Sequence, residues 1–116
     1  MTKVIKIEKD NIYFEDGSIL THQHDSDCCE SHYLDLSNIE LSDFDDLEFD
    51  LSDENFFNRI TDYGIELVPV KGHSVKIPGY GYNNGYYSSN LNLELTLPDG
   101  IRKEFDISEC QDINWG

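Results

Sequence analysis

Segment 91–97 reads Leu-Asn-Leu-Glu-Leu-Thr-Leu, so every second residue is apolar. Successive side chains of a strand point to opposite faces, and this pattern therefore predicts a β-strand with one buried face. The turn-forming pair Asp99-Gly100 follows, and residues 101–107 alternate again. We expect a β-hairpin over residues 91–107. Its core-facing residues would be Leu91, Leu93, Leu95 and Leu97, and its outward residues Asn92, Glu94 and Thr96.

Shorter runs of β-branched and aromatic residues predict further strands. In the N-terminal part they are residues 4–7, 11–14 and 18–22, with Asp16-Gly17 as a hairpin turn before the third run. Further along they are residues 31–36, 65–70 and 73–77, with Lys71-Gly72 between the last two.

The segment 42–61 is ambiguous. Phe44, Leu47 and Leu51 have helical spacing, whereas residues 47–51 also alternate as in a strand. A short helical turn capped by residues 52–55 is compatible with the sequence as well. We therefore expect a mainly β fold, or an α+β fold with one or two short helices, built as a small single-layer or two-layer antiparallel sheet of hairpins. All 116 residues would form a single acidic domain.

The negative charge is concentrated in one long segment. From Asp10 to Asn58 there is no Lys or Arg, while 15 of the 24 acidic residues occur there, and the formal net charge is -16. Such a charge repels nucleic acid and anionic membranes and attracts the proteins that bind them. A hydrophobic content of 38% distinguishes the chain from a disordered acidic tail. We expect a folded protein whose partner carries a basic surface, with no direct binding to nucleic acid or membrane.

The densest acidic cluster, residues 43–54, is the first candidate binding surface. Its seven carboxylates have no basic residue between them: Asp43, Asp45, Asp46, Glu48, Asp50, Asp53 and Glu54. A calcium loop is the alternative, but Glu48 stands where an EF-hand loop requires glycine. The sequence therefore favours a solvated acidic surface.

Residues 78–90 are unusually rich in Tyr, Gly, Ser and Asn. Antibody combining sites use the same residue types, because rigid amphipathic rings stand among adaptable polar groups. Asn84-Gly85 favours a type I′ turn, which would place tyrosines on both sides of a hairpin tip. The alternative is that these tyrosines only cover the sheet. The second candidate binding surface comprises Tyr80, Tyr82, Tyr86 and Tyr87.

The segment 22–32, His-Gln-His-Asp-Ser-Asp-Cys-Cys-Glu-Ser-His, is the candidate for a metal site. On a strand, residues 22 and 24 would point to one face, as two zinc ligands would. Neither a Cys-x2-Cys nor a His-x3-His pair is present, however, and adjacent cysteines on a strand point to opposite faces. We prefer a packing role, with Cys28 and Cys29 reduced and mainly structural. Zinc ligands, in the alternative, would be His22, His24, Cys28 and His32, with Cys110 as a distant candidate.

The sequence contains no recognisable catalytic constellation. A thiolate nucleophile requires an electropositive setting, and the carboxylates around Cys28 and Cys29 provide the opposite. We therefore expect no enzymatic activity and no cofactor. An odd number of cysteines, and the absence of a signal-peptide or membrane-spanning run, favour a reduced, cytoplasmic location.

Segment 21–30 followed by the alternating residues 32–36 resembles the Asp-Cys-Cys-Glu signature of small uncharacterised domains found in phages and prophages. Residues 84–88 and 108–111 are similar to later landmarks of these proteins. The resemblance implies a phage-type accessory protein acting in the host cytoplasm, and it implies no activity. The acidic residues in 40–54 are not part of the pattern.

A small acidic protein of phage type without catalytic residues is expected to bind and inhibit another protein. The specific hypothesis is a nucleic-acid mimic that occupies the basic groove of a nucleic-acid-binding protein, in the manner of an anti-CRISPR or other anti-defence inhibitor. Two alternatives remain open. One is a zinc-binding accessory protein that uses the His/Cys cluster, and the other is a structural or assembly module that forms a homo-oligomer.

Overall fold

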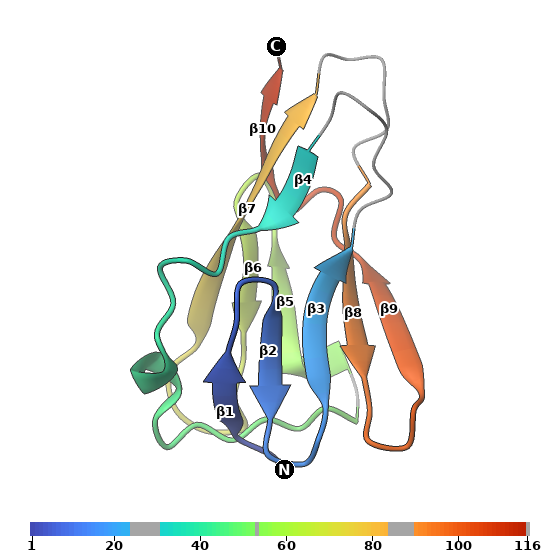
Figure 1. The fold of residues 1–116 in the computed structure, drawn as a ribbon. Helices are drawn as coiled ribbons and strands as arrows, with labels where there is room; N and C mark the ends of the chain where they lie inside the picture. Colours follow the sequence, from blue (N-terminus) through green and yellow to red (C-terminus); the bar gives the residue numbers. More distant parts are fainter. Residues whose placement is uncertain (24–30, 53, 84–89, 116) are drawn as a thin grey trace.

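Two five-stranded β-sheets form the computed structural model of the protein, which describes residues 1–23, 31–52, 54–83 and 90–115 (Figure 1). The first sheet has the order β1-β2-β3-β8-β9 and is antiparallel throughout. Its strands are β1 (Val4–Ile7), β2 (Asn11–Phe14), β3 (Ile19–Gln23), β8 (Asn92–Thr96) and β9 (Arg102–Asp106).

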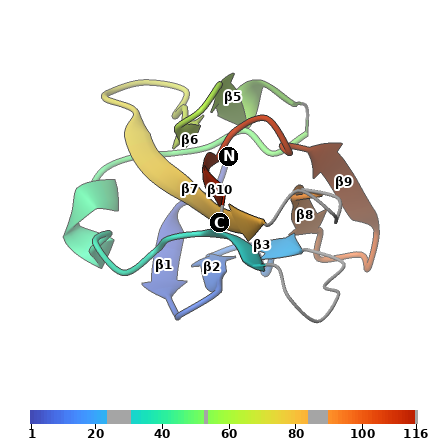
Figure 2. The same ribbon diagram turned by 90° about the horizontal axis from the view of Figure 1, so that it is seen from above.

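The second sheet has the order β10-β7-β6-β5, and β4 also pairs with β7. Its strands are β4 (Ser31–Leu34), β5 (Phe57–Ile60), β6 (Gly64–Leu67), β7 (Val75–Asn83) and β10 (Asp112–Trp115). The first half of β7 pairs with β6, and its second half pairs with β4 and with β10, the latter in parallel. Seen from above, β7 crosses the molecule opposite the first sheet (Figure 2).

The core lies between the two sheets. Phe14 of β2, Leu95 of β8, Ile65 of β6 and Ile77 of β7 are each at most 2% exposed. The edge strands β9 and β5 are joined by an aromatic cluster, in which the Phe105 ring lies 5.8 Å from Phe56 and 5.3 Å from Phe57. Hydrophobic burial of this extent is the main favourable contribution to folding.

The hairpin predicted over residues 91–107 is confirmed as β8 and β9. Its turn contains Gly100 at φ 89°, a conformation that glycine adopts without steric cost. The leucines at 91, 93 and 95 are buried, and Leu97 is half-buried. Glu94 lies on the opposite face as expected, yet it is only 4% exposed, with Arg102 Nε 3.7 Å from its carboxylate.

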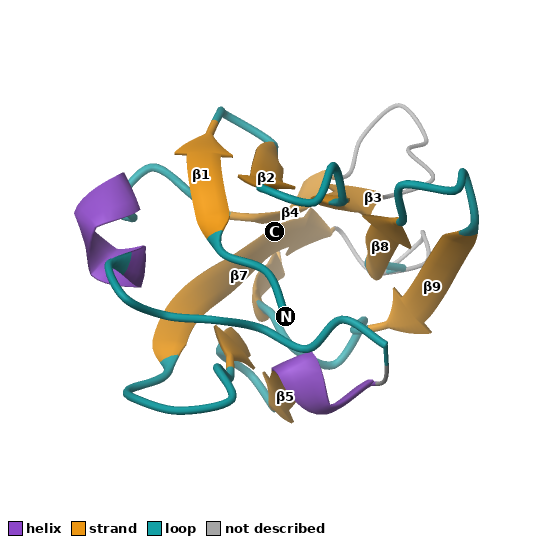
Figure 3. Cartoon of the chain, turned by 90° about the horizontal axis from the view of Figure 1, so that it is seen from below, coloured by secondary structure: helices purple, strands orange, loops and turns teal. Residues whose placement is uncertain are grey.

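The prediction of a mainly β fold with short helices is confirmed, in its two-layer form. Two 3-10 helices, η1 (Leu41–Phe44) and η2 (Glu54–Phe56), lie at the periphery of the sheets (Figure 3). The helical interpretation of 44–51 is wrong, because the helix ends at Phe44 and residues 47, 49 and 51 are buried alternately. Strands β5 and β10 and the second half of β7 were not predicted.

Candidate protein-interaction surfaces

The acidic segment, residues 43–54, is fixed to the body of the protein by its apolar residues. Phe44, Leu47, Phe49 and Leu51 are each at most 6% exposed. Phe49 also exchanges two backbone hydrogen bonds with Thr2, at 3.0 and 2.8 Å. The acidic side chains therefore project from a backbone that is anchored at regular intervals.

The carboxylates of this segment point to solvent. The described ones, all exposed, are Asp43, Asp45, Asp46, Glu48, Asp50 and Glu54, while Asp53 lies outside the described residues. The one ion pair seen between these six and a described Lys or Arg joins Glu54 to Arg59, at 3.9 Å. The segment thus presents mostly uncompensated negative charge.

Asp50 is held by a local turn that recurs twice in the chain. Its Oδ1 accepts hydrogen bonds from the backbone N–H of Ser52 at 3.1 Å and from the Ser52 hydroxyl at 2.6 Å. The same Asp-x-Ser arrangement occurs at residues 35–37 and 106–108. Because both bonds favour the ionised form, the Ser52 hydroxyl first and its backbone N–H second lower the pKa of Asp50.

A tyrosine surface, which we define as Tyr33, Tyr80 and Tyr82, lies on β4 and β7. Tyr80 and Tyr82 were predicted and are 38% and 46% exposed, whereas Tyr86 and Tyr87 lie outside the described residues. Tyr33 was missed. It stands directly opposite Tyr80, with the two ring centroids 6.0 Å apart, and it is 42% exposed.

A signal for Tyr33 exists in the sequence. In a strand, Tyr33 points to the face opposite that of its neighbours His32 and Leu34. Those two side chains are buried, so Tyr33 lies on the outer face. The pairing with β7, which the sequence does not specify, is what brings Tyr33 beside Tyr80.

The two described histidines among the candidate zinc ligands have different surroundings. His22 pairs with Leu93 of β8 and has a side chain only 10% exposed, with its Nε2 3.5 Å from an Asp10 carboxylate oxygen. Burial lowers the pKa of His22, against the opposing effect of Asp10. His32 is buried against Gln111, with Nδ1 2.7 Å from the side-chain oxygen. His24 and Cys28 lie outside the described residues.

The remaining sequence candidates offer little support for a metal or a nucleophile. Within the described ranges, no three His, Cys, Asp or Glu residues are grouped as a metal site would require. Cys110 is fully buried, and burial, then the nearby Glu109 carboxylate, raises the pKa of its thiol. A buried thiol of raised pKa is a poor nucleophile.

A model of one protein family matches residues 1–93, and its description is a domain of unknown function, DUF7448. The match extends from β1 into β8, while β9 and β10, which complete the two sheets, follow it. No curated protein and no solved structure matches the chain. No helix among the described residues is long and apolar enough to span a membrane. On the evidence of the family match, this chain belongs to the family of domains of unknown function DUF7448.

Proposed function

We propose that this protein binds the basic, nucleic-acid-binding surface of another protein and thereby blocks it. The observation that carries the proposal is the acidic segment, whose exposed carboxylates project from an anchored backbone with a single ion pair to a described Lys or Arg. A fixed array of charges loses less conformational entropy on binding than a mobile tail would.

The spacing of the carboxylates supports mimicry of a phosphate backbone. Glu48 and Asp50 stand two residues apart in an extended segment, on the same side of the chain. At about 3.3 Å per residue their backbones are about 6.6 Å apart. A row of negative charges at such intervals suits a groove whose lysines and arginines normally neutralise phosphates.

The tyrosine surface is the second proposed contact. Half-exposed aromatic rings on a rigid sheet are the residues that most often contribute large shares of binding free energy. Strand β4 and the second half of β7, which carry this surface, lie near the top of the molecule in Figure 1, whereas η1 and the acidic segment lie lower. The two surfaces can therefore be tested separately.

The resemblance of the sequence to phage domains suggests the narrower form of the proposal, an inhibitor of a host defence protein of the anti-CRISPR type. Its location would then be the host cytoplasm. An assembly module remains the alternative, in which the tyrosine surface would join copies of this chain.

The experiment is an affinity pull-down from host lysate at two salt concentrations, followed by binding measurements with the captured protein. The variant Asp45→Lys with Glu48→Lys reverses two charges of the acidic segment. Asp46 is left unchanged, because its backbone adopts φ 63° and a lysine there would be strained. The matched control, Glu104→Lys with Glu109→Lys, changes the net charge equally at two exposed positions outside this segment.

We expect the first variant to lose most of its affinity and its salt dependence, and the control to keep both. Equal loss in the two variants would mean that only net charge matters. If binding survives the reversal at Asp45 and Glu48 but disappears in Tyr80→Ala with Tyr82→Ala, mimicry is wrong and the tyrosine surface is the binding site.

A further inference from the structure

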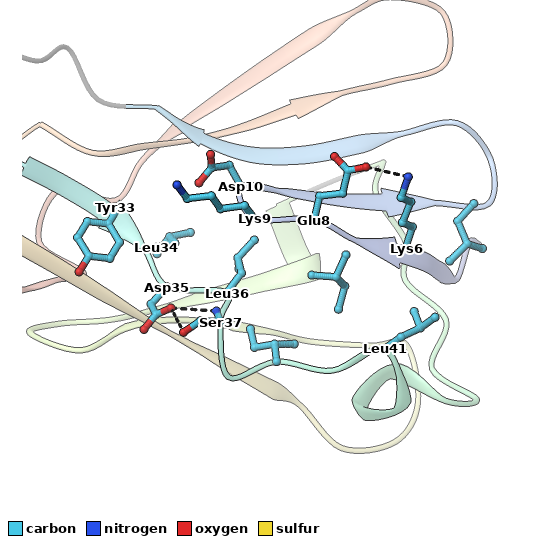
Figure 4. A pocket seen from close by; sticks show the side chains of 13 residues that line it. Lys6, Glu8, Lys9, Asp10, Tyr33, Leu34, Asp35, Leu36, Ser37 and Leu41 are labelled. Atoms are coloured by element: carbon cyan, nitrogen blue, oxygen red, sulfur yellow. Dashed lines mark hydrogen bonds and ion pairs between the residues drawn. The ribbon is translucent and has the colours of Figure 1, made fainter.

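A groove of about 580 Å³ opens between the β1–β2 hairpin and residues 33–41 (Figure 4). Leu34 and Leu36 contribute buried side chains to its lining. Its accessible apolar side chains are Ile5, Leu41 and Tyr33, which are 53%, 45% and 42% exposed. The phenylalanine cluster joins the sheets at β9, whereas the groove lies beside β1, at the opposite edge of the first sheet.

The groove lies beside Tyr33 and Leu34, the last two residues of β4. Strand β4 pairs with β7, and Asp35 continues that pairing by donating its N–H to the carbonyl of Pro78 at 2.8 Å. Because backbone groups alternate along a strand, the N–H and C=O of Leu34 point away from β7. Among the described residues they have no backbone partner. An extended peptide would supply both bonds.

The two strands that flank the groove differ in how their edges are protected. Strand β1 has a register irregularity between Val4 and Lys6. Lys6 lies in the strand, and two further lysines, at positions 3 and 9, lie just outside its ends. Bulges and lysines are features that discourage pairing with another chain. Strand β4, with the sequence Ser-His-Tyr-Leu, has neither a charge nor a proline. Of the two strands, β4 is therefore the one that can pair at the groove, through the backbone groups of Leu34.

The charges of the groove differ from those of the rest of the protein. The groove lining contains two lysines and three carboxylates, so its charge is nearly balanced, whereas the whole chain has a formal charge of -16. Lys6 is paired with Glu8 at 2.7 Å, and the Asp35 carboxylate accepts hydrogen bonds from Ser37. Lys9 has no ion pair with any described residue, and it remains available to an incoming carboxylate.

We propose that this groove binds an extended segment of another protein, which adds as a strand beside Leu34 of β4. Apolar side chains of the segment would lie against Ile5 and Leu41, and one carboxylate would pair with Lys9. The ligand backbone would pair with Leu34, the residue of β4 at the groove whose outward N–H and C=O have no described backbone partner, and a core of about four or five ligand residues suffices for this. A second copy of this chain is disfavoured as the occupant, because two proteins of charge -16 repel each other. The proposal goes beyond the basic-surface binding proposed above, and the groove shares only Tyr33 with the tyrosine surface.

The probe is a displayed library of random twelve-residue peptides, selected on the unmodified protein. We expect the enriched peptides to share alternating apolar residues and one acidic residue. Binding of the best peptide should weaken at least tenfold in Ile5→Glu with Leu41→Glu, and also in Lys9→Glu. The matched control is Ile101→Glu, because Ile101 is 55% exposed and lies outside the groove lining. This control should bind as the parent does.

Amide hydrogen exchange tests the backbone pairing without any substitution. The Leu34 amide should exchange more slowly once the peptide is bound, because its N–H gains a partner. Unchanged exchange at Leu34, or equal affinity of the groove variants and the parent, would overturn the proposal. So would a homodimer that Ile5→Glu with Leu41→Glu converts to a monomer, because the occupant would then be a second copy.

Discussion

The Nδ1 of His32 lies 2.7 Å from the side-chain oxygen of Gln111, although the two residues are 79 positions apart in the chain. The amide nitrogen of Gln111 donates to the carbonyl of Ser108 at 2.8 Å, which orients its oxygen toward the imidazole. His32 is therefore the donor through Nδ1. This bond joins β4 to the start of β10, and Gly81 of β7 lies between them: a Cβ on Gly81 would overlap both the imidazole and the amide oxygen.

Gly81→Ala is expected to destabilise the protein by about 1–3 kcal/mol, because the new methyl group has no space. Urea unfolding monitored by tyrosine and tryptophan fluorescence would measure the change. In a His32→Ala background the same substitution should cost less, since the imidazole no longer blocks the methyl group. An equal cost in both backgrounds would mean that crowding by His32 is not the reason.

Leu95→Asp should unfold the protein or reduce its free energy of unfolding by about 3 kcal/mol or more, because it buries a charge without a partner. Leu95 is fully buried, whereas its neighbour Thr96 is half-buried and points to the other face. Thr96→Asp is the matched control and should cost much less. A Leu95→Asp variant that melts like the parent would show that the register of β8 is wrong.

The parts of the fold that could be predicted are those specified by local sequence. Alternation identified β8 and β9, and Asp16-Gly17 identified the β2–β3 turn, in which Gly17 has φ 96°. The strand predicted over residues 73–77 covers only the first part of β7, and the unpredicted part contains Gly79 and Gly81, residues that are uncommon in strand interiors. The structure explains both glycines by close approach of Cys110 and of His32 with Gln111, which are long-range contacts.

The candidate sites were predictable to a similar extent. Exposure of the acidic segment followed from its composition, and its anchoring by Phe44, Leu47, Phe49 and Leu51 followed partly from their spacing. Tyr33 could not be connected with Tyr80, because strand pairing across 47 positions is not encoded in either segment alone. The groove beside β4 depends on the arrangement of two edge strands and has no local signature.

Ser52→Ala should raise the pKa of Asp50 toward its ordinary value, because the hydroxyl bond that contributes most to lowering it is lost. NMR titration of the aspartate carboxyl carbons would measure this. Asp35 and Asp106 provide internal controls in the same sample, since the turns with Ser37 and Ser108 remain intact. A shift of all three carboxyl groups would point to a general electrostatic effect instead.

Substituting Cys28 and Cys29 by Ala should cost about 1 kcal/mol of stability and no bound metal, in line with the packing role predicted from the sequence. Elemental analysis of protein purified without added metal would test this. Stoichiometric zinc in the parent that is absent from the double variant would contradict it and favour the zinc-binding alternative. His22→Gln is a companion variant, which should leave the metal content unchanged if zinc is not bound.

Stability should decrease in mildly acidic solution because of His22. Burial of its imidazole lowers its pKa in the folded protein below the ordinary value of 6.5, while the unfolded chain keeps that value. Above about pH 6.5 both states are neutral at this position, so the residue contributes no pH dependence. As the pH falls further, the unfolded state takes up a proton that the folded state resists. The free energy of unfolding then falls by at most about 1.4 kcal/mol per pH unit until the folded pKa is reached.

The measurement compares urea unfolding of the parent and of His22→Gln between pH 7.5 and pH 5. Other groups titrate equally in both proteins, so the difference between them isolates His22. The parent should lose more stability than the variant over this range. Asp10→Asn should deepen the loss, because the Asp10 carboxylate, 3.5 Å from the imidazole, favours the protonated form. Parallel pH profiles of the parent and His22→Gln would mean that the imidazole is not held neutral by burial in the folded protein.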